Sequence, residues 1–146
     1  MNYERPGIRV LGTLDAFFNL ILPRRIGALP NLDWRTKKLR EFIDSDAGKV
    51  RWNLNDVCQQ LGLSLSGRQA RRLFKVSTGM GIRVYARNRR LTVAAEQLRA
   101  TNVSIKAIAV DAGYQRTSEF ARSFKEQFCL SPMEFRRVWR QREFAA

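Results

Sequence analysis

The sequence predicts an all-α fold, on three observations. Apolar residues recur at helical spacing along most of the chain, no stretch alternates as a half-buried strand would, and capping residues and glycines divide the pattern into segments. With 146 residues, 45% of them apolar, the chain is long enough to form one domain, or two small ones, around a buried core.

Residues 1–32 are expected to form an N-terminal segment with one short amphipathic helix. Leu14, Phe17, Phe18 and Ile21 are spaced to share one face of that helix. This apolar stretch is too short to span a bilayer, which needs about 20 apolar residues. Three roles remain open for the stripe: packing on the rest of the domain, docking a partner or second copy, and attachment to a membrane surface.

From residue 33 onward the pattern predicts a series of helices. Asp33 is placed to cap the first, whose apolar face is expected to comprise Trp34, Leu39, Phe42 and Ile43. The capping residues, glycines and apolar spacing predict the following helices at about 54–61, 66–77, 82–99, 104–112, 117–128 and 132–140, before a tail at 141–146.

The charge of the chain indicates a polyanionic partner. There are 27 Lys and Arg residues against 13 Asp and Glu, a formal net charge of +14. No acidic residue occurs between Val57 and Ala95, and this window contains Arg68, Arg71, Arg72, Lys75, Arg83, Arg87, Arg89 and Arg90. A merely solvated surface mixes both signs, so the window favours a binding face for nucleic acid or an anionic membrane.

The composition argues against most enzyme classes. The chain has no histidine, which excludes His-based zinc sites and Ser-His-Asp triads. Cys58 is expected to be a buried small residue, and Cys129 to be structural, with redox sensing left open. We also find no paired carboxylates and no glycine-rich phosphate loop, so neither an enzymatic activity, a cofactor nor a metal is expected.

Two stretches about 51 residues apart repeat one plan. A short helix with a small residue is followed, four residues later, by a glycine turn and then by a longer basic and aromatic helix, the plan of a helix-turn-helix. The corresponding residues are Cys58, Gly62 and 72–75 in the first stretch, and Ala109, Gly113 and 122–125 in the second.

Further motifs accompany this repeat: Gly62-Leu63-Ser64, Leu73-Phe74-Lys75, Thr78-Gly79, Arg90-Leu91, Ala94-Ala95, Ile108-Ala109, Gly113-Tyr114, Ser118, Phe120, Arg122, Phe124-Lys125, Ser131-Pro132 and Phe135-Arg136. With them, residues from about 36 to 140 resemble the DNA-binding domain of AraC/XylS-type bacterial transcription regulators. The resemblance implies a domain at 33–140 with two helix-turn-helix units, at about 54–77 and 104–128, on a linker helix at about 82–99. Such units would read two adjacent major-groove segments of duplex DNA.

The register of the first unit is ambiguous, because Gly62 and Phe74 lie about two residues further apart than is usual in the family. Counted back from Leu73-Phe74-Lys75, the resemblance places the base-reading positions on Arg68, Arg71 and Arg72. Counted forward from Gly62, it places them on Ser66, Gln69 and Ala70. We prefer the first count, because alanine offers no hydrogen bond and because this count leaves Leu73 and Phe74 buried.

In the second unit the resemblance places the base-reading positions on Thr117, Ser118 and Arg122. The arginines of both units are able to bind guanine O6 and N7 with two hydrogen bonds, or to contact phosphate without reading sequence. Thr117 and Ser118 have helix capping as an alternative role. Phosphate or secondary contacts are expected from Ser66, Gln69, Lys75, Arg116 and Lys125.

The expected function is that of a sequence-specific transcription regulator, which binds the major groove as a monomer rather than as an obligate dimer. The alternatives are a non-specific or architectural nucleic-acid binder and an adaptor for RNA polymerase. We expect a cytoplasmic, nucleoid-associated protein with no membrane partner. About 35 residues precede the domain, too few for the sensory domain of most family members, so the chain is either a small regulator or the tail of a longer one.

Overall fold

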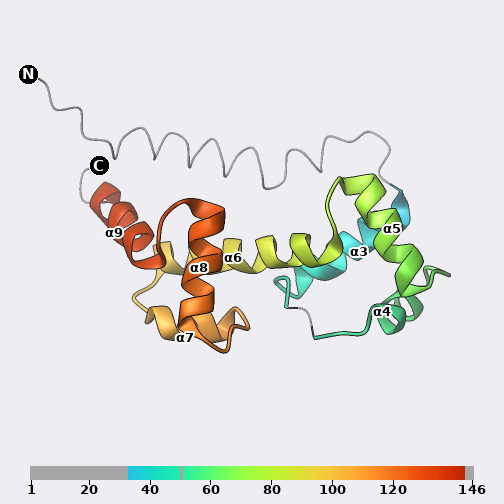
Figure 1. Ribbon diagram of the computed structural model, residues 1–146, viewed down its shortest axis with the longest axis horizontal. Helices are drawn as coiled ribbons and strands as arrows, with labels where there is room; N and C mark the ends of the chain where they lie inside the picture. Colours follow the sequence, from blue (N-terminus) through green and yellow to red (C-terminus); the bar gives the residue numbers. More distant parts are fainter. Residues whose placement is uncertain (1–32, 50, 144–146) are drawn as a thin grey trace, which may run out of the picture. The chain divides into compact units, whose positions relative to one another are not determined.

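The computed structural model describes residues 33–49 and 51–143, and the helix expected around residues 14–21 lies outside them. All regular structure in these residues is helical, which confirms the all-α prediction (Figure 1). The helices are α3 (Trp34–Ser45), α4 (Leu54–Gln60), α5 (Gly67–Thr78), α6 (Ile82–Ala100), α7 (Ile105–Asp111), α8 (Thr117–Phe128) and α9 (Pro132–Glu143). Helix α9 continues past Arg140, where the sequence pattern had placed its end.

Side-chain caps explain where several of these helices begin. Asp33, Asn53, Ser66 and Ser104 each precede a helix and accept a hydrogen bond from a backbone N–H of its first turn, at 2.9, 2.9, 3.2 and 3.1 Å. Each cap satisfies a donor that has no partner within the helix. The boundaries are therefore encoded locally, which is why the sequence pattern located them.

The long helix α6 serves both halves of the domain with different faces. Near its start, Ile82 and Ala86 belong to the core formed with α3, α4 and α5. Further on, Leu91, Ala95 and Leu98 are buried where α6 contacts α7, α8 and α9. At 3.6 residues per turn these two sets lie on nearly opposite sides of the helix. Helix α6 thus joins two separate small cores.

The first core is mainly aliphatic, and Trp34 is not part of it. Leu39 and Ile43 of α3 are buried as predicted, but the prediction for Trp34 is wrong because this side chain is 57% exposed. Thr36 takes the inward position in the first turn of α3, where its hydroxyl lies 3.3 Å from that of Ser77 on α5. Trp34 instead lies beside Lys38, whose Nζ is 5.3 Å from the ring centroid.

The second core is mainly aromatic. Phe120, Phe124, Phe128 and Phe135 are buried, and Phe124 contacts the other three at centroid distances of 4.5–5.6 Å. Trp139 extends the cluster from α9. The guanidinium groups of Arg99 and Arg142 lie 4.3 and 5.1 Å from its ring centroid. Trp139 itself is half-buried at the edge of this cluster.

The loop after α3 connects the two halves. Gly48 is buried against α6, and a Cβ atom there would lie 2.3 Å from the carbonyl oxygen of Ala86. This close approach and its φ of +72° both require glycine. The neighbouring Lys49 forms an ion pair of 3.3 Å with Asp111 of α7, which also accepts a 2.9 Å hydrogen bond from Gln97 of α6.

Candidate nucleic-acid interface

Two helix pairs, α4 with α5 and α7 with α8, have the same local construction. Each first helix is followed by a glycine with positive φ, Gly62 at 65° and Gly113 at 82°. In both turns the next N–H donates back into the preceding helix, to the carbonyl of Cys58 or of Ala109, at 2.9 Å. Both of these small residues are 1% exposed, so the helices of each pair pack closely at this point.

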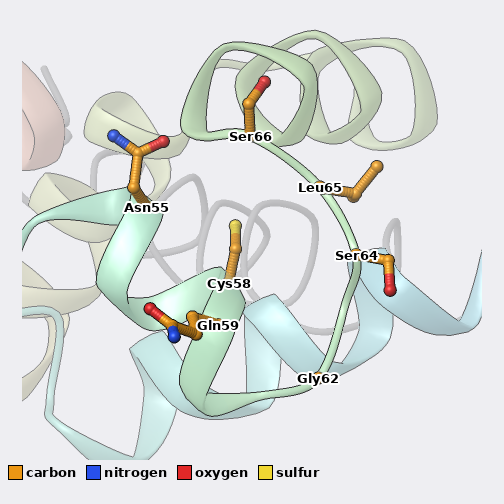
Figure 2. Close-up of a pocket in the computed structure, with 7 residues that line it drawn as sticks. All are labelled: Asn55, Cys58, Gln59, Gly62, Ser64, Leu65 and Ser66. Atoms are coloured by element: carbon orange, nitrogen blue, oxygen red, sulfur yellow. The ribbon is translucent and has the colours of Figure 1, made fainter.

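The turn of the first pair is longer by one residue. Residues 61–66 connect α4 to α5, whereas residues 112–116 connect α7 to α8. The additional residue is accommodated around Ser64, a non-glycine residue with a φ of 50° (Figure 2). From the start of the second helix onward, each residue of the first pair corresponds to the residue 50 positions later in the second pair. Their C-caps, Gly79 and Cys129, are both left-handed and 50 residues apart.

The longer turn borders a hollow whose lining includes the thiol of Cys58. Figure 2 shows it bordered by Cys58 and Gln59 of α4 and by the turn as far as Ser66. Burial raises the pKa of the Cys58 thiol, which keeps the thiol protonated and supports a packing role. At the rim, Asn55 Oδ1 accepts a 2.6 Å hydrogen bond from the N–H of Gly67 and so fixes the start of α5.

Helix α5 presents cations on its outward face. Arg68, Arg72 and Lys75 are exposed at a spacing of i, i+4 and i+7, opposite the buried Ala70 and Phe74. Ala70 is 0% exposed, so the alternative count that made it a reading position is incompatible with the packing.

The other members of the alternative count are engaged in capping. Ser66 and Gln69 form a reciprocal capping box at 2.8 and 3.2 Å, which holds both side chains at the start of α5. Arg71 is exposed on the flank of the outward face that borders α6.

Helix α8 places different residues at the matching positions. Ser118, Arg122 and Lys125 are exposed and correspond to Arg68, Arg72 and Lys75 one unit earlier. Thr117 and Arg116 are also exposed at the start of the helix, and Arg116 makes no side-chain capping hydrogen bond.

Two acidic residues of α8 were missed as candidates from the sequence. Glu119 and Glu126 are exposed, and they stand where α5 has Gln69 and Val76. The exposed side chains of α5 therefore carry four positive charges, those of Arg68, Arg71, Arg72 and Lys75, and no negative one, whereas the exposed side chains of α8 carry two of each sign. The sequence could have revealed them, because aligning the two units with an offset of 50 residues places both glutamates opposite uncharged residues of α5.

A comparison with protein-family models gives one match, described as a helix-turn-helix domain, over residues 57–138. This range begins in α4, ends in α9 and includes both helix pairs and the helix between them. The chain belongs to the AraC/XylS-type family. Its two helix pairs are accordingly the tandem helix-turn-helix units of an AraC-type DNA-binding domain.

Curated AraC-type relatives include transcription regulators of different lengths. The chain is 39% identical over 83 residues to the HTH-type transcriptional activator RhaR of Mannheimia succiniciproducens, a match that covers 57% of this chain and 29% of RhaR. It is 37% identical over 84 residues to the regulatory protein SoxS of Escherichia coli K12, covering 58% of this chain and 77% of SoxS. The chain thus spans less than a third of RhaR and most of SoxS.

Solved structures agree with this family assignment. The C-terminal domain of AraT, a response regulator from Geobacillus stearothermophilus, superimposes with a TM-score of 0.65 at 26% identity, over 74% of this chain and 88% of that one. An AraC-type regulator from Chromobacterium violaceum gives the same TM-score at 23% identity, over 73% of this chain and 93% of that one, which supports the fold.

Within 33–49 and 51–143, no helix is long and apolar enough to cross a membrane. In the same ranges, no three Cys, Asp or Glu side chains come together as a candidate metal site.

Proposed function

We propose that this protein is a sequence-specific regulator of transcription that binds duplex DNA through α5 and α8. The observation that carries the proposal is the tandem repeat itself. Two helix-turn-helix units of one register present exposed cations at matching positions of their second helices, Arg72 and Lys75 in the first unit and Arg122 and Lys125 in the second. Such a helix is the element that enters the major groove in this class of domain.

In this proposal Thr117, Ser118 and Arg122 of α8 face base edges, whereas Arg68, Arg71 and Arg72 occupy the corresponding reading positions of α5 and mainly contact phosphate. An arginine fork pairs with O6 and N7 of guanine and discriminates by roughly 1–3 kcal/mol, whereas hydroxyl groups contact bases or phosphate. Lys75, Lys125 and Arg116 are assigned to the backbone. Ser66 and Gln69 keep their capping roles and contribute at most secondary contacts.

The binding unit in this proposal is a monomer. Both reading helices belong to one chain, so an asymmetric site is sufficient, with two contacted segments about one helical turn apart. On one face of straight B-DNA their centres are roughly 34 Å apart, and a shorter separation requires bending. Helix α6, with 19 residues, sets the distance between the two units.

The remaining parts of the proposal follow from DNA binding. A protein that acts on bacterial promoters is cytoplasmic and associated with the nucleoid. RNA polymerase is the natural second partner of a regulator that works at a promoter.

A non-specific or architectural role is the second candidate, favoured by the uniformly positive outward face of α5. Such a face attracts phosphates regardless of sequence. The two candidates differ in whether a preferred site exists at all.

Selection of bound duplexes from a random pool tests the proposal. We expect a bipartite, asymmetric motif, which should outcompete random duplex at fixed salt by at least roughly a thousand-fold. A strictly palindromic motif with one segment per protomer would contradict the monomer model. Recovery of no motif would favour the architectural candidate.

A further inference from the structure

Two hollows on the domain share one side chain, Trp52. The first, of about 730 Å³, extends from Trp52 to Arg71 and Lys75 of α5 and to Arg83 at the start of α6. The second, of about 610 Å³, extends from Trp52 past Lys49 and Arg51 to Arg90 of α6 and to the turn glycine Gly113. The two neighbouring hollows are here together termed the central groove, and their lining comes from both helix-turn-helix units and from α6.

The lining of the central groove is strongly positive. Its cations are Lys49, Arg51, Arg71, Lys75, Arg83 and Arg90. Only Asp46 and Asp111 oppose them, and Asp111 is already engaged by Lys49 and Gln97. Among the described residues, Arg51 and Arg83 are exposed and form neither an ion pair nor a hydrogen bond. A concave surface with this charge concentrates anions.

Two of the side chains that line the groove carry buried donors that lack an acceptor. Trp52 Nε1 and Arg90 Nε are both shielded from solvent, and neither has a hydrogen-bond partner among the described residues. The guanidinium of Arg90 is held 5.4 Å from the ring centroid of Tyr114, which fixes its position beside the second unit. Leaving such donors unpaired is costly, so a bound acceptor would stabilise the site.

The position of the groove indicates which anion it takes. One end is formed by Arg71 and Lys75 of the first reading helix, and the other by Gly113, four residues before the second reading helix begins. If α5 and α8 occupy adjacent major-groove segments, the DNA between those segments lies along the surface that joins the two helices.

We propose that the central groove binds the sugar-phosphate backbone of the DNA between the two contacted segments. This inference rests on the proposed function. A single small anion would fill only one hollow, whereas a DNA strand presents one charge per 3.4 Å of helix axis and supplies acceptors along both. Trp52 Nε1 and Arg90 Nε donate to phosphate oxygens, and Arg51 and Arg83 neutralise neighbouring phosphates.

The test uses the full chain, its selected duplex and a random duplex, with Arg51→Gln, Arg83→Gln and the matched control Arg137→Gln. Arg137 is an exposed arginine of α9 that lines neither hollow. Each groove variant should weaken both duplexes by roughly five- to ten-fold near 0.1 M salt and lower the slope of log affinity against log salt by about 0.9. Groove variants that behave like Arg137→Gln would overturn the proposal.

Neutral methylphosphonate linkages test the same contact from the DNA side, without any change to the protein. Placed between the two selected segments, they should weaken wild-type binding and remove the further loss caused by Arg51→Gln and Arg83→Gln. Full additivity of the two losses would overturn the proposal.

A third test observes Trp52 directly. The indole N–H resonance of Trp52, assigned with Trp52→Phe, should shift on addition of duplex. A shift with inorganic phosphate but none with duplex would instead assign the groove to a small anion. If the wild-type protein binds selected and random duplexes equally well, the proposed function is refuted. That result differs from groove variants that simply behave like the control.

Discussion

The two helix-turn-helix units share a backbone plan and differ in the chemistry that they present. Helix α5 offers Arg68, Arg72 and Lys75 with no acidic residue on the same face, whereas α8 offers Ser118, Arg122 and Lys125 flanked by two glutamates. Uniform positive charge attracts any phosphate backbone, while mixed charge rejects groups that do not match it. From this difference we predict that the first unit supplies attraction and the second supplies selectivity.

The cores below these helices differ as well. Phe74 of the first unit contacts one ring, that of Tyr85, in a core that is otherwise mainly aliphatic. Phe124, at the matching position of the second unit, contacts the rings of Phe120, Phe128 and Phe135. One helical scaffold is thus stabilised in two ways, and the surface and the interior of each unit are separately testable.

The largest expected effect is that of salt on DNA binding. If roughly six to ten phosphates are neutralised, affinity should fall a thousand-fold or more between about 50 and 200 mM salt. Simultaneous Arg68→Gln, Arg72→Gln and Lys75→Gln should reduce the salt slope by about 2.7, because three phosphate contacts are lost. Fluorescence anisotropy over a salt series measures both quantities, and a wild-type affinity that does not change with salt would contradict the electrostatic account.

A smaller effect distinguishes the two cores. Aromatic pairs contribute roughly 0.5–1.5 kcal/mol beyond burial, and Phe124 makes two more of them than Phe74 does. Phe124→Leu should therefore lower the free energy of unfolding by about 1–3 kcal/mol more than Phe74→Leu. Chemical denaturation of both variants provides the comparison, and equal losses would show that the aromatic cluster adds nothing beyond area.

The smallest effect concerns the matched C-caps Gly79 and Cys129. Both residues are left-handed, with φ of 77° and 60°, but only glycine adopts this conformation without strain. Cys129→Gly should raise the free energy of unfolding by about 0.5–1 kcal/mol, since relief of strain exceeds the added entropy of the unfolded chain. Gly79→Ala should lower it by about 1 kcal/mol, and thermal unfolding should show these opposite signs.

The sequence was sufficient to predict the helices, the two turns and most of the core, because caps, glycines and apolar spacing act over a few residues. It failed for Trp34, whose inward place is taken by Thr36 through a contact with α5 that no local pattern reveals. It also gave no indication of the central groove, because packing of the loop after α3 on α6 brings Arg51 and Trp52 beside Arg90. The exposure of Arg68, Arg72 and Arg122 agrees with their expected role, and base reading by them stays a prediction.

A reciprocal pair of alanine substitutions tests the unequal roles of the two units most directly. Arg122→Ala and Arg68→Ala are to be measured on the selected duplex and on random duplex at one salt concentration. We predict that Arg122→Ala costs about 1–3 kcal/mol on the selected duplex and relaxes selectivity at one or two base pairs, whereas Arg68→Ala weakens both duplexes by similar factors. The opposite pattern, a uniform loss for Arg122→Ala and a selective one for Arg68→Ala, would contradict the assignment of selectivity to the second unit.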